Sequence, residues 1–440
     1  MGVRFTRLSR VLSVSKSPLF RNSYFLLART FVAYSLGFFF WLVVARSYSE
    51  KTVGIAAALL STLLLLARGS ALGLPTGLLR FLPAESDKLR LLNWTFTVSG
   101  LAALAIGLVF FAGMSFWAPS LLFVRADPVL AVMILVSLVF FTLDGVLDNA
   151  FTAMRRADYG LIRSSIFHGL RIPFVLLVTA LGVFGIVFSW TLSLAVSVVG
   201  LAVLLPRLFP GWRPYPALRG MTKHGIWGFS VWSFAGALAG GAAPFLMPLL
   251  ILNTLGPDVG PVASGHYYAA FTIATYLYAV PGAFSTSLLV EGSHPGTQFR
   301  SDIRRTVRYS APLMAVGIAG SILLGRWVLA LFGKGYSDDG YGTLVLLALM
   351  SPIPLVTSVL ATDLRVAKRV RPLFYISSIS STCELLAAWI LLPIIGILGA
   401  AVGVVGGDIV TLVLVIGALA LRPPPGTATD LAESAPTTKR

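Results

Sequence analysis

Long hydrophobic segments follow one another along almost the whole chain, and short segments rich in Gly, Pro, Lys or Arg separate them. A helix needs about 20 mostly apolar residues to cross the hydrocarbon core of a bilayer. Twelve segments have this length, at 22–46, 53–82, 93–113, 129–154, 161–184, 185–205, 225–252, 262–290, 306–331, 341–364, 372–392 and 393–421. The pattern predicts an all-α polytopic membrane protein with twelve transmembrane helices.

The composition agrees with this pattern. Of the 440 residues, 57% are hydrophobic and only 12% are charged, with a mean hydropathy of +0.86, which leaves too little polar surface for a water-soluble globular protein. Cys383, the single cysteine, lies in an apolar segment, so neither a disulfide nor a cysteine metal site is available. No phosphate-binding G-x-x-x-x-G-K-S/T motif occurs, which excludes an ATP-driven pump in one chain. We expect no metal, no cofactor and no catalytic residue.

Positive charge decides the expected orientation. The chain carries 34 Lys and Arg against 17 Asp and Glu, a net charge of +17. Basic residues gather in the arm at 1–21, in the loop after the second segment and in every second loop beyond it, and such loops stay in the cytoplasm. We therefore expect a multi-pass protein of the cell inner membrane with both termini cytoplasmic. Charge spread over membrane-flanking loops meets anionic lipid headgroups and does not indicate nucleic-acid binding.

The two halves of the chain read as copies of one six-helix unit. YSEKTVGIAAALLST after the first helix and GPDVGPVASGHYYAAFTIAT after the seventh are each a polar turn with Gly, followed by a helix rich in small residues. Repeats with an even number of helices are parallel, and a substrate site lies between them. The predicted units are a basic cytoplasmic arm (1–21), an N-terminal six-helix lobe (22–205), a cytoplasmic link (206–224), a C-terminal six-helix lobe (225–421) and a disordered cytoplasmic tail (422–440).

Two arginines lie inside hydrophobic segments. Arg29 is about 10 Å and Arg68 about 18 Å along a helix from the cytoplasmic end of its segment. A charge at such a depth costs at least about 2.5–3.5 kcal/mol, so each guanidinium needs an anionic partner or an anionic cargo. For Arg29 the alternative is a side chain that extends back to the cytoplasm, and for Arg68 it is a structural ion pair.

Four ionisable residues are expected to cluster on the fourth and fifth helices. With a turn centred near 157–158, Asp144 lies at the level of Arg171 and Asp148 at the level of His168. The two acids share one helix face at i,i+4, and His168 and Arg171 share another at i,i+3. Two interpretations stay open: a structural salt bridge, or a proton-responsive switch in which an acid or His168 titrates.

A pair of carboxylates is expected between the last two helices. Glu384 and Asp408 lie at equal distances along the chain from Gly396, the centre of the turn that joins these helices. Two carboxylates at one depth in lipid do not both ionise readily. Coupling to a proton or sodium gradient is one interpretation, and hydrogen bonding to neighbouring helices is the other.

An aromatic stripe runs along the eighth helix. Tyr267, Phe271 and Tyr278, at i, i+4 and i+11, lie on one face. Aromatic faces suit contact with sugars or prenyl chains, but the same spacing also serves ordinary helix packing.

Several stretches resemble one family over nearly the whole chain. The run NSYFLLARTFVAYSLGFFFWLVVARSYSEKTVG, followed by LGLPTGLLRFLP, resembles the opening of bacterial polysaccharide-export flippases. These belong to the multidrug/oligosaccharidyl-lipid/polysaccharide exporter superfamily. Later stretches agree with this resemblance: LNTLGPDVG, HYYAAFTIATYLYAVPGAFSTSLLVEGS, LFGKGYSDDGY and GILGAAVG.

The resemblance implies a V-shaped pair of six-helix lobes around a central cavity. Such a protein moves a polyprenyl-diphosphate-linked oligosaccharide from the inner to the outer leaflet by alternating access, for cell-surface polysaccharide synthesis. Arg29, Arg68 and Arg171 would then bind the diphosphate, because a guanidinium fork holds phosphate oxygens bidentately and stays charged. Partners would be membrane lipids, a polysaccharide polymerase and glycosyltransferases.

Other function classes remain as alternatives. A cation-coupled multidrug exporter of the same superfamily would share the architecture, but its cargo would favour acids and aromatics over deep arginines. A membrane glycosyltransferase would need acidic residues in a large outer first loop, whereas that loop here is short and holds only Glu50. A scaffold partner would need no charged cavity. We therefore expect a transporter and not an enzyme.

Overall fold

The computed structural model describes residues 18–217, 225–292, 299–366 and 370–421. The tail expected at 422–440, most of the arm expected at 1–21 and part of the link expected at 206–224 lie outside the described residues. The described chain is helical apart from turns and short connections, which confirms the predicted all-α class.

The first half of the structure, residues 18–217, holds six membrane-length spans. Its main helices are α2 (Pro18–Ser47), α3 (Glu50–Ser70), α4 (Leu74–Phe81), α5 (Lys88–Ala112), α8 (Pro128–Ala153), α9 (Ala157–Leu177) and α10 (Gly182–Ala202). Short helical segments lie between or after them: η1 (Leu82–Ala84), α6 (Met114–Trp117), η2 (Pro119–Leu121), α7 (Leu122–Ala126), η3 (Thr179–Leu181) and α11 (Leu205–Leu208). Helices α3 and α4 together make one of the six spans.

The second half, residues 225–421, also holds six spans. Its helices are α12 (Gly225–Thr254), α13 (Gly256–Gly292), α14 (Phe299–Phe332), α15 (Lys334–Met350), α16 (Pro352–Val366), α17 (Val370–Ile395) and α18 (Ile397–Ala420). Helices α15 and α16 together make one span. The structure therefore agrees with the predicted twelve transmembrane helices.

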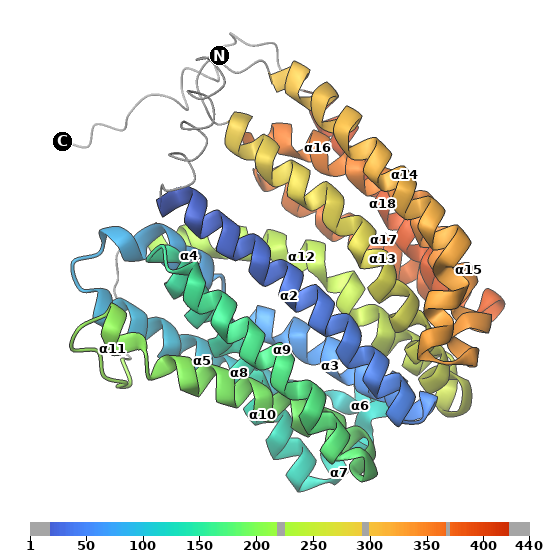
Figure 1. Cartoon of the computed structure of the whole chain (residues 1–440), viewed down its shortest axis with the longest axis horizontal. Coiled ribbons are helices and arrows are strands. Elements are labelled where there is room, and N and C mark those ends of the chain that lie inside the picture. Colours follow the sequence, from blue (N-terminus) through green and yellow to red (C-terminus); the bar gives the residue numbers. More distant parts are fainter. Residues whose placement is uncertain (1–17, 218–224, 293–298, 367–369, 422–440) are drawn as a thin grey trace, which may run out of the picture.

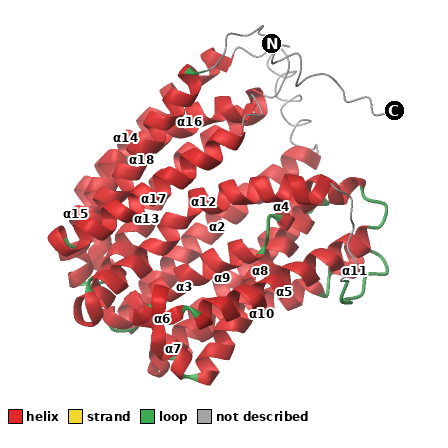
Figure 2. Ribbon diagram, turned by 180° about the vertical axis from the view of Figure 1, so that it is seen from behind, coloured by secondary structure: helices red, strands yellow, loops and turns green. Residues whose placement is uncertain are grey.

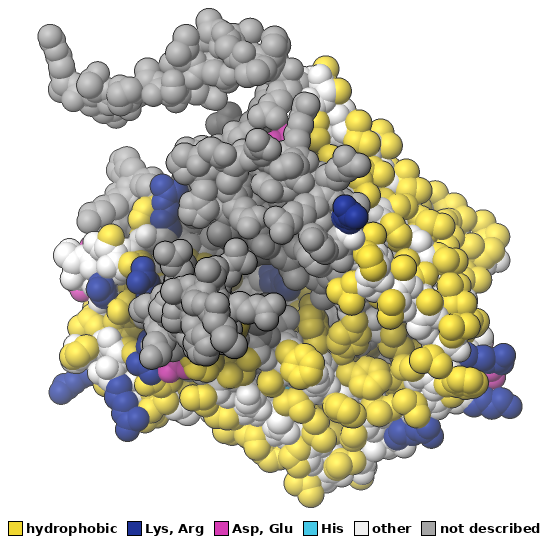
Figure 3. Space-filling model, turned by 45° about the horizontal axis from the view of Figure 1, so that its top comes forward, with side chains coloured by type: hydrophobic (Ala, Val, Ile, Leu, Met, Phe, Trp, Pro, Cys, Tyr) yellow, Lys and Arg dark blue, Asp and Glu magenta, His cyan; other side chains and the backbone are white. Residues whose placement is uncertain are grey.

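The surface has the character of a protein that faces lipid. Among the described residues, ten helical segments are long and apolar enough to cross a membrane, and α12 adds a shorter apolar helix at Leu238–Thr254. Large side chains that a soluble protein would bury are open on α14, where Val316, Leu323 and Trp327 are 71%, 73% and 70% exposed. Figure 3 shows one face covered largely by hydrophobic side chains, with Lys and Arg near its margins.

Two of the predicted helices are each broken into two. The segment at 53–82 ends its first helix at Ser70, because Leu72 and Gly73 adopt positive φ values of 51° and 70°. Pro75 then begins α4 in its first turn, where a missing N–H is tolerated. The segment at 341–364 breaks at Ser351, directly before Pro352. An apolar pattern alone does not show such breaks, since both sides of each break remain hydrophobic.

The two halves meet along four helices. Figures 1 and 2 show α5, α8, α9 and α10 on one side of the molecule and α14 to α18 on the other. Between them, α3 packs against α12 and α13, while α2 packs against α9 and approaches α13 and α14. Side chains and backbone of α2, α3, α12 and α13 thus decide how the halves fit together.

One end of the bundle closes this interface, and we name it the turn end. It contains the turn between α2 and α3 at residues 48–49, the starts of α13 and α15, and the end of α14. Ser49 fixes this turn, because its Oγ accepts a hydrogen bond from the backbone N–H of Thr52 at 3.3 Å and caps α3. The opposite end, where α2 begins and α13 ends, is the start end (Figure 1).

Two polar contacts join the halves at the turn end. Arg46, in the last turn of α2, donates from Nη2 to the carbonyl oxygen of Ala330 at 3.0 Å and from Nε to that of Leu331. Asn253, near the end of α12, donates to the carbonyl oxygen of Trp117 at 3.1 Å and accepts from the N–H of Ser120 at 3.3 Å. These bonds satisfy carbonyl groups at helix ends, which otherwise lack partners.

Glycines bring α3 and α13 into backbone contact at the same end. A Cβ on Gly54 would lie 1.6 Å from the carbonyl oxygen of Pro261 and 2.8 Å from the N of Gly265. The Oγ of Ser264 also donates to the carbonyl oxygen of Gly54 at 3.3 Å. Small residues are what allows two membrane helices to approach so closely.

Candidate functional site

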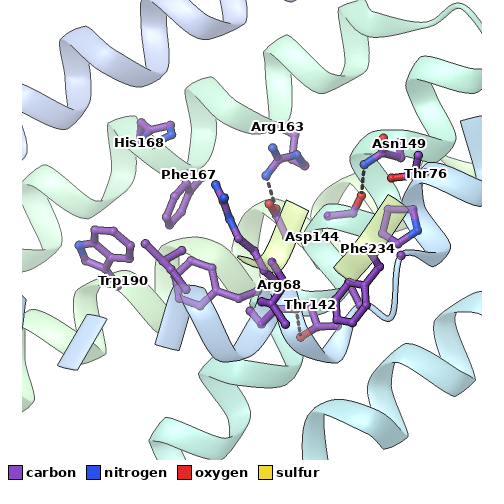
Figure 4. Close-up of a pocket in the computed structure, with 18 residues that line it drawn as sticks. Arg68, Thr76, Thr142, Asp144, Asn149, Arg163, Phe167, His168, Trp190 and Phe234 are labelled. Atoms are coloured by element: carbon purple, nitrogen blue, oxygen red, sulfur yellow. Dashed lines mark hydrogen bonds and ion pairs between the residues drawn. The ribbon is translucent and has the colours of Figure 1, made fainter. Parts of the chain in front are cut away.

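The central pocket lies between the halves and has a volume of about 520 Å³. Helices α3, α4, α8, α9, α10 and α12 contribute to its wall. Its polar lining consists of Arg68, Thr76, Thr142, Asp144, Asn149, Arg163 and His168. Its aromatic lining consists of Phe141, Phe167, Trp190 and Phe234 (Figure 4). A pocket of this size with a few polar groups on an apolar wall is typical of a ligand site.

Arg68 is the cation of this pocket that has no acidic partner in the described part of the chain. It lies in the last turn of α3, two residues before the break that separates α3 from α4. Its guanidinium lies 4.5 Å from the ring centroid of Phe245, and Nη1 is 3.4 Å from the place that a Cβ of Gly241 would take. Figure 4 shows the side chain reaching from α3 into the pocket. The contacts are with aromatic and small residues, which leaves the positive charge available to an anion.

Two other deep cations of the first half, Arg163 and Arg29, are neutralised by acids. Arg163 of α9 forms an ion pair with Asp144 and lies 3.5 Å from Asp148, both on α8. Arg29 of α2 forms an ion pair with Asp148. Gly160 makes room for this network, since its Cβ would lie 3.0 Å from Oδ1 of Asp148. Two aspartates therefore hold two arginines and tie three helices together.

This network differs from the pairing expected at the α8–α9 hairpin. Asp144 was expected at the level of Arg171 and Asp148 at the level of His168, whereas both acids contact Arg163. The turn occupies residues 154–156, between the end of α8 and the start of α9, and is therefore earlier than the expected centre at 157–158. The earlier turn moves the facing position on α9 toward its start. Arg163 is not among the residues that the sequence pattern singles out, because it lies near the start of the predicted segment 161–184, beside the basic turn.

His168 and Arg171 lie apart from these acids. His168 lines the central pocket, and its buried Nδ1 has no hydrogen-bond partner in residues that the structure describes. Arg171 is only 2% exposed and is surrounded by rings: its guanidinium carbon lies 4.5 Å from Phe40, 4.7 Å from Trp190 and 5.3 Å from Phe167. Arg171 therefore joins α2, α9 and α10 through cation–π contacts and does not line the central pocket.

Glu384 and Asp408 line one pocket in the second half, with a volume of about 260 Å³. It lies between α12, α13, α16, α17 and α18. Gly407 lets α18 approach Glu384, because a Cβ there would be 3.3 Å from Oε2 of that carboxylate. Oε1 of Glu384 is buried and has no hydrogen-bond partner among the described residues. The second pocket thus contains two carboxylates, and one oxygen of Glu384 there lacks a hydrogen-bond donor among the described residues.

The aromatic stripe of α13 divides between this second pocket and the core. Phe271 and Tyr278 line the pocket, and the Tyr278 hydroxyl donates to the carbonyl oxygen of Leu347 at 3.3 Å. Tyr267 is fully buried and stacks on Phe271, with ring centroids 5.6 Å apart. The stripe therefore faces away from the central pocket and toward the carboxylate pair.

Breaking the Arg29–Asp148 pair should destabilise the first half. Asp148→Asn leaves the guanidinium of Arg29 without its carboxylate; these side chains are 26% and 15% exposed, and removing one partner of a fully buried pair costs about 3–5 kcal/mol, which is the upper bound here. We expect a clear fall in the melting temperature of the purified protein, measured by tryptophan fluorescence, and a partial recovery when Arg29→Gln is added.

Asp158→Asn is the matched control for this experiment. Asp158 pairs with Arg156 at 2.8 Å, but both side chains are about one third exposed, at 31% and 35%. Exposed pairs contribute about 0–1 kcal/mol. Equal melting temperatures for Asp148→Asn and Asp158→Asn would contradict a stabilising role for the network.

The comparisons with known proteins agree on the fold. No family model and no curated protein sequence matches the chain. Among solved structures, the lipid II flippase MurJ in an inward closed conformation matches with a TM-score of 0.72 and 14% identity, over 91% of this chain and 88% of that one. An inward-facing multidrug resistance MATE family transporter of the MOP superfamily matches with 0.67 and 14%, over 93% and 99%.

A further solved structure, MATE in complex with MaL6, matches with a TM-score of 0.62 and 14% identity, over 92% of this chain and 95% of that one. At such low sequence identities the similarity shows the fold alone. It does not assign any site residue of those proteins to this chain. The chain therefore has the fold of these transporters.

Proposed function

We propose that this protein is a flippase that moves a polyprenyl-diphosphate-linked oligosaccharide across the cell inner membrane by alternating access, for the synthesis of a cell-surface polysaccharide. The observation that carries this proposal is the charge of the central pocket. Arg68 offers there a guanidinium with no acidic partner among the described residues, while Arg163 of the same pocket and Arg29 are neutralised by Asp144 and Asp148. An arginine without an acid, in a cavity within the membrane, is suited to an anionic cargo.

The chemistry of a diphosphate fits this position. A guanidinium donates two parallel hydrogen bonds to phosphate oxygens and keeps its charge where the dielectric constant is low. The pocket of about 520 Å³ would enclose the diphosphate and the first sugars, and its aromatic wall would pack against sugar faces. The prenyl chain would stay in the bilayer. In this proposal Arg29 and Arg171 contact the cargo only in a conformation in which Arg29 has left Asp148 and Arg171 has left its aromatic rings.

The proposed orientation places the start end in the cytoplasm and the turn end outside. It rests on the basic stretches of the sequence between successive predicted spans and at their ends, at 83–92, 155–163, 206–224, 300–308 and 365–371. In this orientation the described conformation is closed toward the outside, where Arg46, Gly54 and Asn253 make contacts between the halves. The cargo would enter from the inner leaflet, and a polysaccharide polymerase and glycosyltransferases would act before or after the transfer.

Ion coupling is proposed for five residues. Glu384 and Asp408 share the second pocket, where one proton or one sodium ion would relieve the repulsion of two carboxylates. Asp144, Asp148 and His168 are the candidates in the first half, where protonation of an acid would release Arg29 or Arg163. Either change would alter which conformation is favoured, because ligands shift such equilibria by binding one state better.

A cation-coupled multidrug exporter is the second candidate. Asp144 lies in the same pocket as Phe141, Phe167 and Trp190, and such a combination of acid and aromatic rings also suits an organic cation. A membrane glycosyltransferase or a scaffold partner is a weaker candidate, since neither needs a charged pocket between two halves.

Depletion of the protein tests the proposal. Lipid-linked oligosaccharide is expected to accumulate in the cytoplasmic leaflet, measured by accessibility of the glycan to an impermeant lectin in right-side-out and inverted vesicles. Restoring the intact chain should return the glycan to the outer leaflet. Unchanged lipid-linked sugars together with new sensitivity to cationic drugs would favour the multidrug exporter and overturn the flippase.

A further inference from the structure

His266 holds a position between two carboxylates at the turn end. It lies in α13 and is 1% exposed. Its Nδ1 is 3.0 Å from Oδ2 of Asp339 on α15, and its Nε2 is 3.1 Å from Oε2 of Glu50, the first residue of α3. Glu50 belongs to the first half, whereas His266 and Asp339 belong to the second. The imidazole therefore bridges the two halves.

The two contacts of His266 together call for two hydrogen-bond donors on the imidazole. An ionised carboxylate only accepts hydrogen bonds, so each ring nitrogen must donate one. A neutral imidazole has a single N–H and can satisfy one carboxylate only. Both contacts exist together when His266 carries two N–H groups and a positive charge. Loss of one proton would leave either Glu50 or Asp339 without its donor.

The surroundings favour a cation at this place. Negative charge surrounds the imidazole, and the Tyr336 ring packs against it with centroids 4.7 Å apart. Asp258 of α13 and Asp338 of α15 line the same pocket as His266 and add negative charge, although Asp338 also pairs with Arg326 of α14 at 3.2 Å. The Glu50 carboxylate lies against the first turn of α15, where a Cβ on Gly335 would be 2.6 Å from its Oε1.

The bridge borders a pocket at the turn end. A pocket of about 620 Å³ is lined by His266, Asp339, Asp258 and the turn between α17 and α18 at Gly396. All of these lie at the turn end, so the pocket belongs to that end and is separate from the central pocket, whose lining contains none of them.

We propose that His266 is a proton-binding site that holds the two halves together at the turn end. Proton binding completes the bridge from Glu50 through His266 to Asp339 and closes this end; proton release removes one bond and favours opening. The proposal rests on the alternating access and orientation of the proposed function. In that orientation the site takes its proton from outside, and the proton favours the return of the emptied transporter to the closed state.

The test measures the distance between the halves and needs no cargo. Nitroxide labels are attached at Arg125→Cys on α7 and Lys334→Cys on α15, two exposed positions at the turn end, in a Cys383→Ser background. Distance distributions are recorded by electron paramagnetic resonance in lipid nanodiscs at about pH 5 and about pH 8, the range in which histidine changes charge. We expect the ratio of closed to open molecules to fall about tenfold at the higher pH, as for loss of one charged hydrogen bond.

Variants separate the bridge from other titrating groups. His266→Gln and Glu50→Gln should each make the distance distribution almost independent of pH, and Glu50→Gln changes only the residue of the first half. Asp338→Asn is the matched control, because it removes a neighbouring charge whose ion pair among the described residues, with Arg326, lies within the second half, and it should keep the pH response of the starting protein. A pH response that survives in both glutamine variants, or none in the starting protein, would overturn the proposal. The cargo assigned to the central pocket affects none of these outcomes.

Discussion

Arg68→Ala is expected to reduce the transfer of polyprenyl-diphosphate-linked oligosaccharide about 10- to 100-fold, because a hydrogen bond to a charged group contributes about 1.5–3 kcal/mol. The side chain faces the central pocket and meets Phe245 and the backbone at Gly241, so its removal takes away no ion pair among the described residues. The loss should therefore appear as reduced transfer and not as unfolding. Initial rates of transfer into vesicles that contain the purified protein measure it.

Two further variants make this result specific for phosphate binding. Arg68→Lys keeps the charge but loses the planar fork, so it should recover part of the rate. Arg326→Ala removes an exposed guanidinium, 66% exposed and paired with Asp338, and should leave the rate near that of the intact protein. If Arg68→Ala moved the cargo as fast as Arg326→Ala, the central pocket would not be the place where the diphosphate binds.

The same variants distinguish the two proposed cargoes. An organic cation gains nothing from Arg68, and removing that positive charge from beside Asp144 should improve its binding. The flippase proposal thus expects Arg68→Ala to lose transport, whereas a multidrug exporter would keep or increase drug efflux. Efflux of a fluorescent cation, measured with the same vesicle preparations, gives this comparison.

The sequence predicted those parts of the structure that depend on local pattern. Long apolar segments gave the spans, because a helix in lipid must satisfy its own backbone groups along its whole length. The proximity of Glu384 and Asp408 could also be predicted from local pattern. Their two helices are joined by a tight turn at Gly396, with φ of 61°, so equal distances from that glycine correspond to equal depths.

The α8–α9 hairpin shows where this argument fails. Its turn contains no glycine, and Arg155 itself takes the positive φ of 57°. Polar residues extend well beyond the turn on its α9 side, so the centre of the turn could not be located from composition, and an error of a few residues moved the facing position from Arg163 to Arg171. The break at Leu72 and Gly73 was hidden for a different reason, since hydrophobic residues continue on both sides of it.

Contacts between the two halves could not be predicted from the sequence. Glu50 and His266 are far apart in the chain, and no periodicity links them; only the packing of α3 on α13 brings them together. Within the first half, Arg171 also escaped prediction, because its partners are rings on α2, α9 and α10 and not the acid expected for a buried cation. A buried arginine is expected to pair with an acid, but aromatic rings around the guanidinium also stabilise its positive charge in part, through cation–π contacts.

Gly54→Ala is expected to prevent closure of the turn end. The added Cβ would lie 1.6 Å from the carbonyl oxygen of Pro261, a backbone atom that cannot rotate away, so α3 must separate from α13. Overpacking of this kind costs about 1–3 kcal/mol, which corresponds to a roughly 5- to 150-fold shift in the ratio of closed to open molecules. Labels at positions 125 and 334 should then report the longer distance at both pH values, and transfer of the cargo should be largely lost.

Gly69→Ala in the same helix is the matched control for this prediction. A Cβ at Gly69 meets nothing within 4 Å, and alanine favours the helix by about 1 kcal/mol over glycine. This variant should therefore keep the short distance and the transfer rate. A distribution for Gly54→Ala like that of Gly69→Ala would mean that α3 and α13 can bend locally to admit a methyl group. The backbone contact at Gly54 would then have no part in closing the turn end, and closure would depend on the polar contacts of Arg46, Asn253 and His266.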